Sequence, residues 1–187
     1  MDGGLMTTKI SGTDGIDVAQ LRAADGDPVA MTISSAGVVA FPQTPAPESI
    51  RGFFQAKTAA DQLFTSGSLG KVSLTETFDQ DGWFTSPSGH RYTPQIAGYY
   101  QFFANLWMSA TGNITTHQAY FYKNGVTTNQ GALMADAIGS GKIVSISAVI
   151  YLNGTTDYVE LFAAITGTSP EILADGTYFS GSLLKAA

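Results

Sequence analysis

Three stretches of the sequence alternate apolar and other side chains with a period of two residues. They run from Gly98 to Ala110, from Ile143 to Leu152 and from Tyr158 to Thr166. Because successive side chains of a β-strand point to opposite faces, this alternation is typical of strands with one face in a core. Turn-forming pairs separate the runs, at Asp81-Gly82, Asn124-Gly125, Asn153-Gly154 and Asp175-Gly176. The pattern therefore predicts an all-β sandwich or barrel, in which only Ala56 to Leu63 has the character of a short helical turn.

The phase of the alternation separates a predicted core from a second face. We expect a protomer core that contains Tyr100, Phe102, Leu106, Ile146, Ile150, Leu161 and Phe179. On the opposite face of the first run lie Tyr99, Phe103 and Trp107, which we expect to contact a partner subunit. A shift of one residue would exchange the two faces, so the inverted assignment stays open.

The chain carries no Asp, Glu, Lys or Arg between Tyr92 and Tyr122. Only 13 % of its residues are charged, about half the share of a typical globular domain. A monomeric sheet normally places charges on its solvated face, partly to prevent edge pairing. Strands without charges imply that a second sheet covers one face and a partner subunit covers the other. The sequence thus predicts an obligate oligomer, with an interface of more than about 2,000 Å².

Charge and cysteine content exclude several classes of protein. The chain has 15 Asp and Glu against 9 Lys and Arg, a net charge of −6, so we expect neither nucleic-acid nor anionic-membrane partners. It has no cysteine, which excludes disulfide scaffolds, thiolate catalysis and cysteine-bearing zinc sites. The start, Met1 to Lys9, is too polar for a signal peptide, and no apolar run approaches the length of a membrane span.

The N-terminal residues differ from the rest of the chain. Asp14-Gly-Ile-Asp-Val-Ala19 recurs eleven residues later as Asp25-Gly-Asp-Pro-Val-Ala30. Evenly spaced turn residues suit a small β arm or fibre shaft, although two unrelated Asp-Gly turns explain the pattern equally well. Prolines between Pro42 and Pro47 predict a stiff, extended linker. We therefore expect an arm over residues 1–45, ending in this linker, and a head domain over residues 46–187.

No candidate motif for catalysis or cofactor binding is complete. Lys71 and Lys142 follow glycine-containing segments, but these lack the first glycine and the hydroxyl residue of a phosphate-binding loop. His90 and His117 have no neighbouring acid, so neither a zinc site nor a hydrolytic triad is indicated.

Asp79 and Asp81 are the only close carboxylate pair of the predicted head. The remaining ligands of a calcium loop are missing after them, which favours a solvated turn. Glutamates are too few to suggest a glycosidase pair. Aromatic side chains can stack on sugars, but alternating in strands they are more typical of a core and an interface. We expect no enzyme, no cofactor and no metal ion.

Short motifs follow one another in a fixed order between Phe53 and Leu184. An aromatic-led segment of the form F-T-x-P-x-x-G-x-Y-x-F is matched at Tyr92, Pro94, Gly98, Tyr100 and Phe102. Further matches are a Y-K-N hairpin at Tyr122–Gly125, an L-x-L-x-x-G-D-x-V-x-L region at Val144–Leu152 and Asp157–Leu161, and a closing F-S-G-x-L-L at Phe179–Leu184. The set resembles the globular heads of complement component 1q, in the tumour-necrosis-factor superfamily. This resemblance implies a trimeric jelly-roll sandwich behind a small β-rich N-terminal arm.

The chain has no collagen stalk, and its arm-plus-head arrangement resembles short fibre and spike proteins of tailed bacteriophages. The segments that carry this resemblance are Lys9–Ile16 and Arg91–Tyr100. It implies a homotrimeric virion protein assembled in the host bacterial cytoplasm, whose arm attaches to another virion protein and whose head meets the host surface, where a glycan is the expected receptor. The alternatives are a capsid decoration protein without a receptor, a secreted bacterial adhesin and, as an enzyme, a polysaccharide-degrading spike.

Overall fold

The computed structural model describes residues 32–33, 39–40, 51–135 and 139–187. Contacts divide the chain into two units, Met1–Glu48 and Ser49–Ala187. In the first unit, β1 (Thr32–Ile33) and β2 (Val39–Ala40) pair antiparallel. The predicted Asp-Gly repeat and proline-rich linker lie outside the described residues, and the bounds of the arm stay a prediction.

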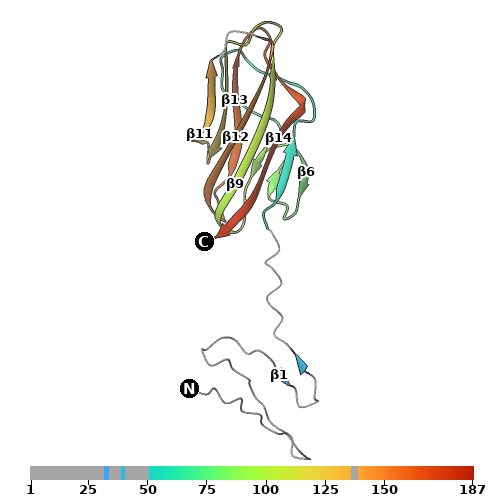
Figure 1. Ribbon diagram of the computed structural model, residues 1–187, viewed down its shortest axis with the longest axis vertical. Helices are drawn as coiled ribbons and strands as arrows, with labels where there is room; N and C mark the ends of the chain where they lie inside the picture. The colour runs from blue at the N-terminus through green and yellow to red at the C-terminus, as the bar shows by residue number, and fades with distance from the viewer. Residues whose placement is uncertain (1–31, 34–38, 41–50, 136–138) are drawn as a thin grey trace, which may run out of the picture. The chain divides into compact units, whose positions relative to one another are not determined.

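The second unit is a sandwich of two antiparallel, six-stranded sheets (Figure 1). One sheet has the order β12-β9-β14-β3-β6, with β4 also paired to β14, and is called the β9 sheet here. Its strands are β3 (Phe54–Lys57), β4 (Gln62–Leu63), β6 (Thr75–Asp79), β9 (Ala97–Ser109), β12 (Gly141–Asn153) and β14 (Glu171–Ala186).

The other sheet, called the β10 sheet, has the order β11-β10-β13-β8-β7, with β5 also paired to β13. Its strands are β5 (Gly70–Lys71), β7 (Phe84–Thr85), β8 (Arg91–Tyr92), β10 (Thr116–Lys123), β11 (Val126–Ala135) and β13 (Val159–Thr166). The described ranges contain no helix, and therefore none long and apolar enough to cross a membrane. The all-β prediction is confirmed, and the residues of the possible helical turn after Ala56 form β3, a loop and β4 instead.

The alternation of the sequence appears directly in the burial of the long strands. In β9 every even-numbered residue from Gly98 to Met108 is buried, and the odd-numbered residues between them are half-buried or exposed. In β12 the even-numbered residues from Val144 to Leu152 are buried in the same way. The observed strand ends differ from the predicted ones by one or two residues, because the ends depend on hydrogen bonds to neighbouring strands.

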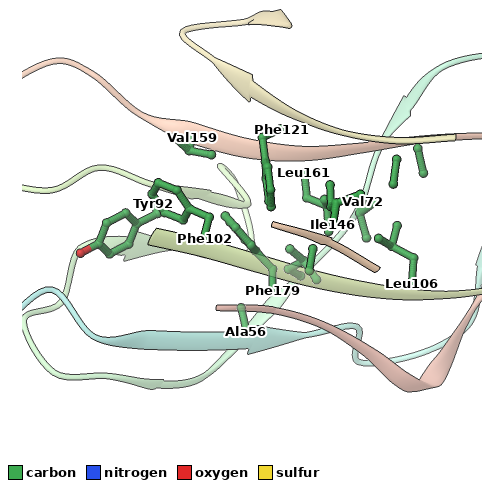
Figure 2. Close-up of a cluster of buried hydrophobic side chains, with 14 of the residues drawn as sticks. Ala56, Val72, Tyr92, Phe102, Leu106, Phe121, Ile146, Val159, Leu161 and Phe179 are labelled. Carbon is green, nitrogen blue, oxygen red and sulfur yellow. The ribbon is translucent and has the colours of Figure 1, made fainter. Parts of the chain in front are cut away.

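Aromatic side chains from both sheets meet at the centre of the sandwich. Figure 2 shows Phe102 and Phe179 of the β9 sheet facing Phe121 and Leu161 of the β10 sheet. The ring of Phe179 lies 5.7 Å from those of both Phe102 and Phe121, and 5.0 Å from that of Phe54. All seven residues expected in the protomer core have buried side chains: Tyr100, Phe102, Leu106, Ile146, Ile150, Leu161 and Phe179.

Two buried tyrosines place their hydroxyl groups on backbone carbonyls. The Tyr92 hydroxyl donates to the Gly52 carbonyl oxygen at 2.9 Å, and the Tyr100 hydroxyl donates to that of Ile96 at 2.8 Å. Burial raises the pKa of the Tyr92 hydroxyl, and burial with the nearby Asp81 charge raises that of Tyr100 to about 12. Both hydroxyls therefore stay protonated and remain hydrogen-bond donors at neutral pH.

Gly52 is held at the start of this unit by contacts to other parts of the fold. Its N–H donates to the Asp81 carboxylate at 2.7 Å, and its carbonyl accepts the Tyr92 hydroxyl. Its φ is +67°, and a Cβ here would lie 2.7 Å from the Tyr92 hydroxyl oxygen. The position therefore requires glycine both for its backbone conformation and for space.

The predicted turn at Asp175-Gly176 is wrong, since β14 continues on both sides of it and remains paired to β9. Residues 174–177 form a bulge, at which the register between the two strands shifts. The Trp107 N–H donates to the Thr177 hydroxyl at 2.9 Å, and the Asn105 side-chain amide donates to the Gly176 carbonyl at 2.6 Å. The Asp-Gly pair therefore lies in a β-bulge, which places extra residues in one strand and, like a turn, often contains glycine.

The loop between β12 and β13 is organised by two side chains. The Asn153 side-chain oxygen accepts the N–H groups of Thr155, Thr156 and Asp157 at 2.9–3.0 Å. The Asp157 carboxylate accepts hydrogen bonds from the Asn124 side-chain amide at 2.8 Å and from the Asn153 N–H at 3.0 Å. It also forms an ion pair with Lys123 at 2.8 Å. The loop conformation is thus fixed without a helix or strand of its own.

These contacts predict a dependence of stability on pH. Burial acts to raise the pKa of Asp157, but the hydrogen bonds from Lys123, Asn124 and the Asn153 backbone outweigh it, so the pKa is lowered in the fold. A lowered folded-state pKa contributes stability above the unfolded value of about 3.9 and loses it as pH falls through the folded value. In urea titrations at constant protein concentration, Asp157→Asn should be less stable than wild type at pH 7. The difference should shrink below about pH 4, whereas a constant difference would contradict the ionic role.

Candidate subunit interface

The outward face of the β9 sheet carries an unusual number of exposed aromatic side chains. On β9, the second strand of this sheet, Tyr99 is 50 % exposed, Phe103 49 % and Trp107 38 %. These are the three side chains predicted from the sequence to contact a partner subunit. The structure places them on one face and on one strand, and their contact with another chain stays a prediction.

The strands beside β9 determine how these side chains are presented. Phe103 lies in register between Ser147 of β12 and Ser180 of β14. Both neighbours are too small to cover its ring, so the ring is available to fit into a partner surface. Trp107 is paired with Ile143 on β12, which is itself exposed.

Aromatic and aliphatic neighbours extend the apolar face around these three side chains. Tyr99 and Tyr151 are cross-strand partners whose rings lie 5.4 Å apart in a T-shaped arrangement. Together, the exposed residues that we call the β9 patch are Tyr99, Phe103, Trp107, Ile143, Val149, Tyr151 and Tyr178. Groups of exposed apolar side chains are uncommon on soluble monomers and are a feature of interaction sites, so this face is the candidate interface.

Asn105, at the centre of the β9 patch, is already hydrogen-bonded. Asn105 lies between Phe103 and Trp107 on β9, and its side-chain oxygen accepts the Ser145 hydroxyl at 2.7 Å. Its amide donates to the carbonyl of Gly176 in the bulge. The outward positions of β9 and β12 within the described ranges carry no charged residue. A partner that covers these two strands therefore meets no charged side chain on them, and charged groups are among the most costly to desolvate.

The outward face of the β10 sheet is different in character. The Lys71 ammonium forms an ion pair with Glu160 of β13, and it also contacts the Gly89 carbonyl at 3.3 Å. The Arg91 guanidinium lies 4.6 Å from the centre of the Tyr158 ring. This face carries charged side chains, as expected of a surface that meets water.

The two aspartates considered as a calcium loop hold backbone groups. Asp79 accepts a hydrogen bond from the Phe84 N–H, and Asp81 accepts one from the Gly52 N–H. In the part of the chain that the structure describes, no group of three or more His, Asp or Glu side chains could hold a metal ion.

The structure keeps the two histidines in separate environments. His117 is 2 % exposed, on the core side of β10. His90 precedes β8, with its Nδ1 atom 2.8 Å from the Leu74 carbonyl oxygen.

Comparison with solved structures identifies the architecture of this unit. Murine APRIL at pH 5.0, a TNF-like protein, matches with a TM-score of 0.56 at 9 % identity, covering 71 % of this chain and 98 % of that one. The globular domain of zebrafish complement 1qA matches with a TM-score of 0.53 at 15 % identity, covering 73 % of this chain and all (100 %) of that one. The second unit is a TNF/C1q-like jelly roll. The predicted all-β jelly-roll fold is therefore confirmed. Protein-family models and curated protein sequences give no match to the chain.

Within this jelly roll, the sequence pattern identified the central strand of the patch but not its neighbours. The alternation of residues 143–152 already set Val149 and Tyr151 on the outward side of their strand. Their proximity to β9, however, follows from the pairing of Tyr151 with Tyr99. That pairing joins residues far apart in the chain, and no local pattern specifies it.

Proposed function

We propose that the chain assembles as a homotrimer through the β9 patch, and that its role is binding or structural rather than catalytic. The observation that carries the proposal is the aromatic outward face of β9 and β12, whose outward positions carry no charged residue and on which Asn105 is already hydrogen-bonded. Closed rotational symmetry lets each copy cover its patch against its neighbours. The sequence resemblance to complement 1q heads favours three copies over two.

Mass measurement tests the assembly directly. Sedimentation equilibrium of the full chain at micromolar concentration should give a species of about three times 19.6 kDa. Because the patch carries no charge, raising the salt concentration should not dissociate this species. A stable monomer under these conditions would contradict the proposal, and a stable dimer would contradict the threefold assembly.

We further infer that the chain is a structural virion protein of a tailed bacteriophage, a fibre or spike. Support comes from the segments Lys9–Ile16 and Arg91–Tyr100, which resemble those of such proteins. In this role the N-terminal residues attach to another virion protein, and the jelly roll is displayed outward and binds the host surface. Three identical heads on one axis would convert weak single contacts into firm attachment.

Imaging of purified particles tests the location. An antibody against the jelly roll should label intact virions, and the purified chain should bind host cells. Labelled virions combined with no cell binding would favour the alternative of a capsid decoration protein without a receptor. Absence from virions, with secretion by a bacterium, would favour the adhesin instead.

A further inference from the structure

A second surface feature lies apart from the residues of the β9 patch. It is a cavity of about 540 Å³, wide open to solvent, beside β7 and β8 of the β10 sheet. Its lining residues are Gly82, Trp83, Thr85, Arg91, Thr93, Gln95, Gly154 and Thr155. This volume is in the range of sites that bind small molecules, and the lining shares no residue with the patch.

The lining is polar and has one charge. Arg91 is the only ionisable side chain among the residues that the structure assigns to it. Thr85, Thr93 and Thr155 supply hydroxyl groups, and Gln95 supplies an amide. Hydroxyl and amide groups both donate and accept hydrogen bonds, so the cavity suits a ligand with several hydroxyl groups and one negative charge.

The Arg91 guanidinium has a restricted orientation, but no acidic side chain that the structure describes neutralises its charge. Its guanidinium packs over the Tyr158 ring at 4.6 Å, which restricts its orientation. Glu160 is its cross-strand partner, but the Glu160 carboxylate is engaged by Lys71. Over the described ranges Arg91 has no ion pair, so its charge remains available to an anion.

Two polar atoms in this lining are buried without a partner. Within the described part of the chain, Arg91 Nε and Thr93 Oγ1 have no hydrogen-bond partner. Such atoms are uncommon in folded proteins, because each has lost its water without replacing it.

One wall of the cavity is fixed in advance. Gly154 and Thr155 belong to the loop that the Asn153 side chain holds through three backbone N–H groups. A Cβ at Gly154 would lie 2.3 Å from the Ala97 backbone nitrogen, so this turn packs closely on the start of β9. A site that is ordered before binding loses less entropy when the ligand arrives.

We propose that this cavity binds an acidic sugar, with its carboxylate on Arg91 and its ring hydroxyls on the threonines and Gln95. The planar guanidinium group matches a carboxylate with two parallel hydrogen bonds. Trp83 is only 7 % exposed, so recognition depends on polar contacts rather than on stacking. The inference deepens the proposed host-surface role and rests on it for its biological meaning.

Calorimetric titration of the assembled protein tests the site. Galacturonate should bind in the millimolar range, and galactose, its neutral counterpart, at least about tenfold more weakly. Arg91→Gln should lose at least about tenfold in galacturonate affinity. Arg51→Gln is the matched control, since Arg51 is exposed and does not line the cavity, and it should bind as wild type does.

A second variant keeps the test valid if Arg91→Gln does not fold. Gln95 is exposed, so Gln95→Ala should fold normally and still weaken galacturonate binding. The proposal is overturned if galacturonate does not bind, if galactose binds equally well, or if both cavity variants bind as tightly as wild type. Sedimentation of the same samples separates the two proposals: trimers that do not bind refute the sugar site, and monomers that bind refute the trimer.

Discussion

Replacing Phe103 with arginine should convert the assembled protein into monomers of 19.6 kDa. The Phe103 side chain is half exposed at the centre of the β9 patch and is flanked by two serines. In the proposed trimer, arginine here would bring three like charges together in a desolvated contact, and buried unpaired charges are among the most costly defects in an interface. Sedimentation at micromolar concentration measures the outcome, and circular dichroism shows whether the monomers remain folded. Trp107→Arg should have the same effect.

The control for this experiment is Val126→Arg, which adds the same charge to an exposed apolar position. Val126 is 66 % exposed at the start of β11, in the other sheet. This variant should sediment like wild type. If Phe103→Arg and Trp107→Arg both remain trimeric, the face assignment is wrong, even though the protein is a trimer.

Truncating Phe179 to alanine should be the most destabilising single change in the core. Its ring packs against those of Phe54, Phe102 and Phe121 and so connects the two sheets. Phe→Ala substitutions in cores cost about 3–5 kcal/mol through lost burial and the cavity left behind. For a domain of this size, that corresponds to a fall in Tm of roughly 6–20 °C.

Thermal unfolding at fixed protein concentration checks this prediction, because assembly makes Tm depend on concentration. Leu63→Ala is the matched control, since Leu63 is 74 % exposed, and it should unfold within about 2 °C of wild type. A Phe179→Ala variant as stable as this control would mean that the two sheets can close over the missing ring.

The sequence predicted the faces of single strands better than it predicted relations between strands. In β9, alternation alone separates buried Phe102 from exposed Phe103, because the side-chain period of an extended chain is a local property. The prediction of a turn at Asp175-Gly176 was wrong because it, too, rested on a local pattern. Asp-Gly chemistry is visible in the sequence, but the continued pairing of β14 with β9 is not.

The two candidate sites differ in how far the sequence could predict them. Tyr99, Phe103 and Trp107 lie on one strand, so a period of two was enough to group them. The cavity joins Trp83 and Arg91 with Thr155, from a separate loop. No local sequence pattern links these three residues. Only the packing of that loop beside β7 and β8 brings them together.

The contacts of Gly52 have a mechanical consequence. At this point the chain enters the jelly roll, and here its N–H is bound by Asp81 and its carbonyl by Tyr92, while the preceding carbonyl of Arg51 accepts the N–H of Leu183 on β14. A pulling force on the N-terminal residues is therefore shared by Asp81, Tyr92 and Leu183 before it reaches β3. A domain tethered in this way resists being peeled open from its first strand.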